Sequence, residues 1–131
     1  ELIKKVKQKY YPKFFLATGN KADEQEILNE ILNNCGDDCV ALNKLSISET
    51  LPIIKNCDIS VCNDSSFSHI SSALNIPTIV LMCDTPLMYG NYSTMMHPIQ
   101  PDGIDNVRHG SLGKDKINSQ KIFNKIVSII N

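Results

Sequence analysis

Short apolar runs alternate along the chain with segments of helical period. Strands buried on both faces are continuous apolar runs, whereas surface helices repeat apolar residues every three to four positions. The runs predict strands within 13–19, 39–43, 59–63 and 78–83. The periodic segments predict helices over 1–10, 22–34, 46–56 and 67–74 and from 119 onward, the third opened by a Ser46–Glu49 capping box and interrupted by Pro52. This alternation predicts a Rossmann-like α/β fold, three layers (α/β/α) around a parallel sheet.

Residues 84–115 have no sustained period and carry Gly, Pro, Asp and Asn throughout. They predict a long surface loop with one short strand at most, near 97–100. Loops of this length in a compact domain tend to be functional or mobile.

Composition limits the chain to one globular domain without a nucleic-acid-binding surface. The 131 residues suffice for a single domain, and 42% hydrophobic with 21% charged residues is globular composition. Thirteen basic and fourteen acidic residues give a formal charge of −1, whereas phosphate-backbone binding needs a basic excess. The chain starts without methionine and without an apolar signal core, so we interpret it as a fragment or excised domain.

The five cysteines predict neither disulfides nor a metal site. Cys57, Cys62 and Cys83 lie in or beside apolar runs, where a thiol packs as a small hydrophobe. Cys35 and Cys39 have C-x3-C spacing without a second ligand pair to complete a zinc site. An odd number of cysteines fits a reducing compartment.

The candidate chemistry lies where the strand at 59–63 passes into the helix at 67–74. Asp64, Ser65 and Ser66 precede a helix N-terminus, whose unpaired N–H groups and dipole form an anion site. One turn further on, His69 can donate to a diphosphate and neutralise its charge as it leaves. Asp and Ser are also ordinary N-cap residues, so a purely structural turn is the alternative.

The usual nucleotide and hydrolase motifs are missing. The sequence has no GxGxxG, no Walker A and no G-x-S-x-G elbow. In open parallel sheets, ligands bind beyond the carboxyl ends of the strands. We therefore expect the turns at 19, 45, 64–66 and 83–86 to line one edge of the sheet.

At this turn the sequence resembles glycosyltransferase family nine, the heptosyltransferases of lipopolysaccharide core synthesis. The family pattern runs approximately D-[ST]-G-x-x-H-x-x-[AS]-A-L-x-x-P, followed by a hydrophobic run and G-x-T. Seven residues fall on it in register: Asp64, Ser65, His69, Ala73, Leu74, Pro77 and Thr85. Residues 19–24 resemble the family's glycine-then-acidic turn, and 44–49 its K-x-S-L-x-E segment. Two departures are Ser66 in place of glycine and Cys83-Asp84 in place of Gly-Pro.

The resemblance implies that the chain is the C-terminal, donor-binding half of a GT-B type enzyme. The first strand of this half and the whole N-terminal acceptor domain would lie before Glu1. The implied reaction is inverting transfer of a heptose-like sugar from a nucleotide-diphosphate sugar, ADP-heptose-like, to a lipopolysaccharide-type or other glycan acceptor. The fragment alone is expected to be inactive.

The resemblance also implies a donor-binding set: Gly19, Asp23, Leu45, Asp64, Ser65, Ser66 and His69. The last four would hold the diphosphate, with His69 as the catalytic residue. Asp23, with Glu24 as the second choice, would bind ribose hydroxyls, and the backbone at Leu45 would meet the base. No cofactor or metal is expected, in agreement with the missing Asp-x-Asp motif.

The implied location is cytoplasmic, with peripheral association of the full protein at the inner face of the membrane. Two alternatives stay open at this point. One is a sugar-nucleotide epimerase or another GT-B enzyme domain. The other is a non-catalytic, flavodoxin-like binding module with an ordinary capped turn at Asp64.

Overall fold

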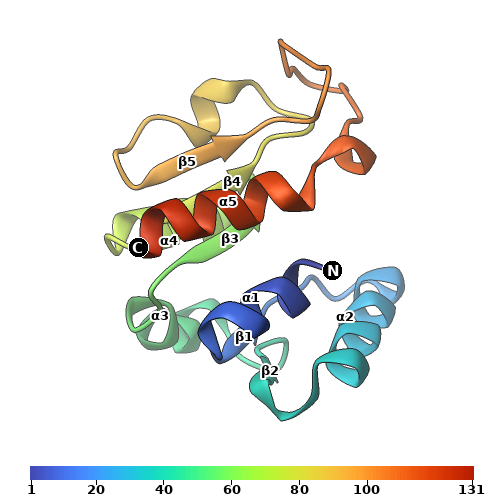
Figure 1. The fold of residues 1–131 in the computed structure, drawn as a ribbon, viewed down its shortest axis with the longest axis vertical. Coiled ribbons are helices and arrows are strands. Elements are labelled where there is room, and N and C mark those ends of the chain that lie inside the picture. The colour runs from blue at the N-terminus through green and yellow to red at the C-terminus, as the bar shows by residue number, and fades with distance from the viewer. The chain divides into compact units, whose positions relative to one another are not determined.

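A computed structural model describes residues 1–131 and divides them into two compact units, 1–50 and 51–131 (Figure 1). The first unit contains α1 (Leu2–Tyr10), β1 (Phe14–Leu16), α2 (Ala22–Cys35), a 3-10 turn η1 (Gly36–Asp38) and β2 (Cys39–Ala41). Helix α3 (Ile47–Lys55) spans the boundary. The second unit contains β3 (Ser60–Asn63), α4 (Ser66–Ala73), β4 (Thr78–Leu81), η2 (Leu87–Gly90), β5 (Met96–Ile99), η3 (Lys114–Lys116) and α5 (Ser119–Ile130). None of the helices is long and apolar enough to cross a bilayer.

The first unit is built on a parallel pair of short strands. β1 and β2 pair from Phe14–Cys39 to Leu16–Ala41. Helix α2 packs against β2 and buries Leu28, which is 1% exposed. Both strands run in the same direction, so the segments after Leu16 and Ala41 leave the pair at the same edge.

Lys7 ties α1 to the C-terminal end of α2. Its ammonium donates to the Cys35 carbonyl at 2.7 Å and pairs with the Asp38 carboxylate at 2.6 Å. Unpaired carbonyls at a helix C-terminus favour a cation there. The contact therefore fixes α1 on the helix that leads into β2.

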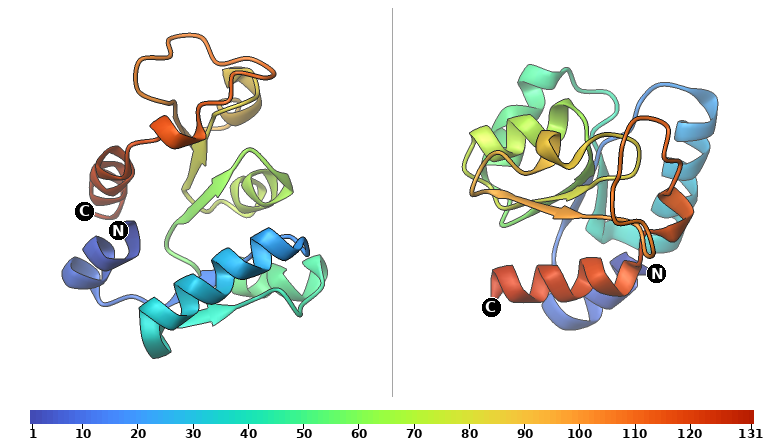
Figure 2. Two further views of the ribbon diagram at one scale, coloured as in Figure 1. Left: turned by 90° about the vertical axis from the view of Figure 1, so that its right-hand side faces the viewer. Right: turned by 90° about the horizontal axis from the view of Figure 1, so that it is seen from above.

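The second unit has the predicted three-layer arrangement. β3, β4 and β5 form a parallel sheet in which Asn63, Leu81 and Ile99 stand side by side at the carboxyl edge. The central strand β4 is the most buried, with Ile79 and Val80 fully covered. Helices α4 and α5 lie on opposite faces of this sheet (Figure 2). The predicted parallel α/β fold is thus confirmed, with four expected strands and five expected helices in place.

One expectation is confirmed and another changes. The segment 84–115 contains one short strand, β5, close to the predicted 97–100, and the 3-10 turns η2 and η3 begin within it. The apolar run of β5 is broken by His97 and Pro98. Proline is tolerated on an edge strand because one side of that strand has no neighbouring strand to receive a backbone hydrogen bond. In addition, the strands pair as two sheets, β1-β2 and β3-β4-β5. The turns at 19 and 45 therefore follow one sheet, and those at 64–66 and 83–86 follow the other.

All five cysteines are free. Burial raises the pKa of Cys62 to about 11. The pKa of Cys39 is also raised to about 11, chiefly by burial and then by its contact with Cys35. Both thiols therefore stay protonated and unreactive at neutral pH.

His97 on β5 makes the stability of the second unit depend on pH. Burial, and to a smaller degree the nearby Lys125 ammonium, lowers the pKa of His97 below its ordinary 6.5. The unfolded chain therefore binds the proton more tightly, and the free energy of unfolding falls as the pH drops below about 6.5. We expect a lower urea midpoint at about pH 5.5 than at about pH 7.5, and a smaller drop in His97→Gln. The exposed His109, changed to Gln, is the matched control. An equal drop in His97→Gln and the unchanged protein contradicts this assignment.

Candidate functional site

The turn after β3 places a helix N-terminus at the carboxyl edge of the second sheet. Ser65 is the N-cap of α4, with extended backbone at φ −158° and ψ 172°. Its N–H donates to the Ser68 hydroxyl at 3.3 Å, and that hydroxyl donates to the Ser65 carbonyl at 2.7 Å. The N–H groups of Ser66 and Phe67 make no hydrogen bond within the chain. The turn is therefore held by Ser68, while two helix donors remain for a ligand.

A chain of side-chain contacts runs through Asp64. The Thr85 hydroxyl donates to Asp64 Oδ2 at 2.5 Å, and Asp64 Oδ1 lies 3.6 Å from His69 Nε2. The other ring nitrogen, Nδ1, lies 2.5 Å from the Tyr92 hydroxyl. The Asp64 side chain is 15% exposed and that of His69 is 41% exposed. The carboxylate is thus mostly buried, while the imidazole stays accessible to a ligand.

His69 Nε2 has no hydrogen bond of its own. Its 3.6 Å separation from the Asp64 carboxylate is longer than a normal N–H···O hydrogen bond. Nε2 is therefore available to donate a hydrogen bond to an anion beside the ring.

A hollow of about 260 Å³ opens beside this turn. It is lined by Asn63, Asp64, Ser65, Leu81, Cys83, Asp84, Thr85 and Lys114. The Asp84 carboxylate accepts the Leu112 N–H at 2.7 Å, so part of its charge is already engaged. The one ammonium in the lining belongs to Lys114.

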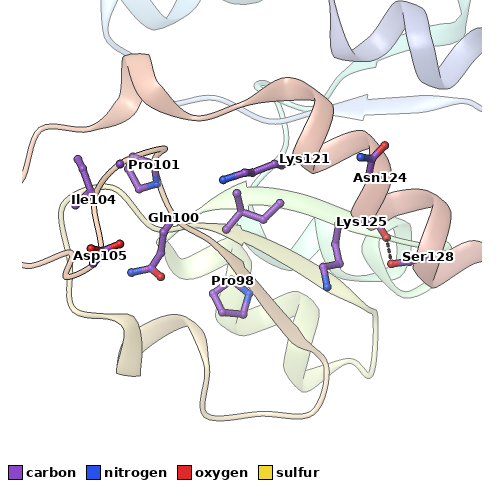
Figure 3. Close-up of a pocket in the computed structure, with 11 residues that line it drawn as sticks. Pro98, Gln100, Pro101, Ile104, Asp105, Lys121, Asn124, Lys125 and Ser128 are labelled. Carbon is purple, nitrogen blue, oxygen red and sulfur yellow. Dashed lines mark hydrogen bonds between the residues drawn. The ribbon is translucent and has the colours of Figure 1, made fainter.

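A second, larger hollow of about 630 Å³ lies between β5, the segment that follows it and α5 (Figure 3). Four residues of α5, Lys121, Asn124, Lys125 and Ser128, line one side of it. The opposite side consists of residues 98–101 and 103–105. Lys121 is paired with Asp102. None of the residues predicted for the site lines this hollow.

In the first unit, Glu24 is engaged in capping and Asp23 is not. The Glu24 carboxylate accepts the Lys21 N–H at 3.1 Å, and its Oε2 would clash with a Cβ added to Gly19. The Glu24 side chain therefore folds back over the turn after β1, where Gly19 has no side chain to block it. Asp23 is exposed on the first turn of α2. Of the two carboxylates considered for ribose, Asp23 is the one left open to a ligand.

Leu45 offers a carbonyl rather than an N–H. Its N–H donates to the Leu42 carbonyl at 2.9 Å in a turn after β2. Nearby, the Gln25 amide donates to the Gly19 carbonyl at 2.6 Å and accepts from the Asn43 amide at 2.9 Å. Gln25, which sequence reasoning missed, thus links the turns that follow β1 and β2.

The structure groups the predicted residues in two sets. Gly19, Asp23 and Leu45 lie in the first unit, whereas Asp64, Ser65, Ser66 and His69 lie together in the second. Sequence reasoning missed the contacts of Thr85 and Tyr92. Thr85 falls on the family pattern, so a signal for it was present. Tyr92 lies 23 positions beyond His69, in a segment without periodicity, so nothing in the sequence pointed to it.

Comparison with known proteins identifies the family. Residues 1–97 match the family described as glycosyltransferase family 9 (heptosyltransferase). Over 115 residues the chain is 30% identical to lipopolysaccharide heptosyltransferase 1 of Campylobacter coli, covering 82% of this chain and 33% of that protein. The chain therefore spans about a third of the length of this relative.

No solved structure matches the chain. The parallel α/β architecture is nevertheless of the Rossmann-like type predicted for part of a GT-B glycosyltransferase. The matched range includes the turn from Asp64 to His69 together with Thr85 and Tyr92, whereas the α5 side of the larger hollow lies beyond it. The family match covers more than half of the chain, and the predicted resemblance is confirmed. The chain belongs to glycosyltransferase family 9, the heptosyltransferase family.

Proposed function

We propose that the chain is the donor-binding half of an inverting heptosyltransferase that uses a nucleotide-diphosphate sugar. The observation that carries this proposal is the turn after β3, where open N–H groups of α4 lie in the same turn as His69. The turn lies within the range that matches the family. The name of the Campylobacter coli relative supports a heptose as the sugar and a lipopolysaccharide-type acceptor. For the nucleotide we propose ADP.

In the proposed reaction, negative charge develops on the leaving diphosphate, which lies at this turn. An acceptor hydroxyl attacks the anomeric carbon of the donor sugar, and its proton passes to a base outside this chain. The bond between that carbon and the diphosphate oxygen breaks, and its electron pair leaves with the diphosphate. The N–H groups of Ser66 and Phe67 and the α4 dipole stabilise this anion. His69 Nε2 donates to the same anion.

We propose that protein groups, rather than a bound metal, hold the diphosphate. The sequence lacks the Asp-x-Asp motif, which supports this choice. The hollow beside the turn contains the carboxylates of Asp64 and Asp84 and the ammonium of Lys114. A diphosphate near two carboxylates needs a cationic neighbour and further hydrogen-bond donors. Lys114 would supply the positive charge, and His69 Nε2–H would supply a donor.

For the first unit we propose contacts with the nucleoside. The exposed Asp23 carboxylate is suited to accept hydrogen bonds from ribose hydroxyls, because Glu24 is already engaged with Lys21. The Leu45 carbonyl is suited to accept from an exocyclic amino group of the base, such as that of adenine. Gly19, under the Glu24 carboxylate, keeps the turn after β1 compact.

The pairing of the strands supports the proposed domain assignment. In a doubly wound sheet of order 3-2-1-4-5-6, strands 2 and 3 pair with each other, and strands 4, 5 and 6 form a second group. The pairs β1-β2 and β3-β4-β5 match these two groups if one strand precedes β1. We propose that this first strand and an acceptor-binding domain lie before Glu1 in the full-length protein, which would work in the cytoplasm at the inner face of the membrane.

Nucleotide binding tests the proposal directly. We expect ADP to raise the melting temperature of the chain, with stabilisation of about 2.7 kcal/mol at a free concentration of about 100 Kd. EDTA should leave the effect unchanged. Ser66→Asp places a negative charge at the α4 N-terminus and should abolish the stabilisation, whereas Ser128→Asp on α5 adds the same charge elsewhere and should preserve it. Scanning calorimetry with and without ADP measures all three proteins.

Three results would redirect the proposal. Stabilisation by UDP and not by ADP favours another GT-B enzyme or a sugar-nucleotide epimerase. Equal stabilisation of the Ser66→Asp and unchanged proteins removes the α4 N-terminus from the site. No stabilisation by any nucleoside diphosphate favours a non-catalytic binding module.

A further inference from the structure

Tyr92 is an exposed tyrosine whose hydroxyl contacts His69. It lies between η2 and β5, and 62% of it is exposed to solvent. Its ring lies beside the imidazole and nearly parallel to it, with centroids 5.6 Å apart and planes 12° from parallel. Its hydroxyl lies 2.5 Å from Nδ1 of the same imidazole. The hydroxyl of an exposed tyrosine is ordinarily hydrated, so its contact with His69 needs a reason.

The contacts of Tyr92 determine which nitrogen of His69 is offered to a ligand. In the neutral imidazole with its proton on Nε2, the Tyr92 hydroxyl donates to Nδ1. This hydrogen bond is directional and therefore restricts rotation of the imidazole about its bond to Cβ. Nε2 is then the nitrogen with an open donor, next to the Asp64 carboxylate at 3.6 Å. Asp64 is itself held by the Thr85 hydroxyl at 2.5 Å.

We propose that Tyr92 is a positioning residue that orients His69 toward the donor diphosphate. The hydroxyl occupies Nδ1 and holds the imidazole in one orientation, and Nε2–H points to the ligand. This inference rests on the proposed function, because it takes His69 as a diphosphate contact. The contact between Tyr92 and His69 can nevertheless be tested without any ligand.

The first arm of the test measures the ¹⁵N resonance of His69 Nδ1 in the ligand-free chain. In Tyr92→Phe the aromatic ring remains and the hydroxyl is lost. We expect the ¹⁵N resonance of His69 Nδ1, assigned by its absence in His69→Gln, to move toward that of an imine nitrogen without a hydrogen bond. Tyr89→Phe is the matched control, because Tyr89 is an exposed tyrosine whose ring lies against His109. An unchanged Nδ1 resonance in Tyr92→Phe overturns the proposal.

The second arm measures ADP binding by titration calorimetry in a double-mutant cycle. We expect Tyr92→Phe to raise the Kd about threefold to tenfold, as for the loss of one hydrogen bond. In the His69→Ala background the same change should alter the Kd by less than about twofold, since Tyr92 acts through His69. An undiminished effect in that background shows that Tyr92 acts by another route and overturns the proposal. Tyr89→Phe should leave the Kd unchanged in both backgrounds.

The two arms separate this inference from the proposed function. If the unchanged chain binds no nucleoside diphosphate, the proposed function fails, and positioning toward a diphosphate fails with it even where the ¹⁵N shift is seen. If the chain binds ADP but Tyr92→Phe moves neither the Nδ1 resonance nor the Kd, only the role of Tyr92 fails. Binding together with both expected changes supports the proposal.

Discussion

Replacing His69 with alanine is expected to lower kcat of the full-length enzyme about 100- to 1000-fold, while the Kd for the donor changes much less. The bond from the sugar to the diphosphate breaks in the transition state, so the negative charge beside the imidazole is larger there than in the bound donor. Removal of one such positioned donor costs about 2.7–4 kcal/mol of transition-state stabilisation. Steady-state kinetics on the full-length protein, together with a donor titration, measures the two effects separately.

The control for this experiment is His109→Ala. His109 is exposed and its ring lies against Tyr89, away from the contacts of Asp64. The His109→Ala variant should have the same kcat and the same melting temperature as the unchanged protein. Near-normal kcat in His69→Ala combined with a clear loss of melting temperature would identify His69 as a structural residue.

Asp64→Ala is expected to lower the free energy of unfolding by about 1–3 kcal/mol, in addition to impairing donor binding. The sequence suggested a helix-cap effect, but the N-cap of α4 is Ser65. The loss instead arises from the Thr85 hydroxyl, which would lose its acceptor in a mostly buried place. Urea denaturation of the chain at constant pH measures this loss of unfolding free energy.

Two further variants locate the Asp64 effect. Asp64→Asn keeps an oxygen for Thr85 and should recover most of the stability, but it removes the charge that faces His69. Asp58→Ala, at an exposed carboxylate just before β3, is the matched control and should change stability by less than about 0.5 kcal/mol. Equal destabilisation by Asp64→Asn and Asp64→Ala would contradict the role of the Thr85 hydrogen bond.

The elements of the fold were predictable because each is encoded by local periodicity. The apolar run before Gly19 gave β1, and the Ser46–Glu49 box gave the start of α3, where the Ser46 N–H donates to the Glu49 carboxylate at 2.8 Å. Strand β5 was harder to predict because His97 and Pro98 break its apolar run. Its place as a strand depends on pairing with β4, which is a long-range contact.

The sequence by itself determined the family, the parallel α/β class and the turn from Asp64 to His69 as the candidate site. These depend on residue types at fixed spacing, which the chain carries whether folded or not. The tertiary structure decided which side chains meet there: Thr85 and Tyr92 reach Asp64 and His69 from 21 and 23 positions away. It also decided that Glu24 is engaged with Lys21, which leaves Asp23 open to a ligand. Periodicity and spacing describe neighbours along the chain. Hydrogen bonds and ring contacts form between atoms that only the folded backbone brings within a few ångströms of each other.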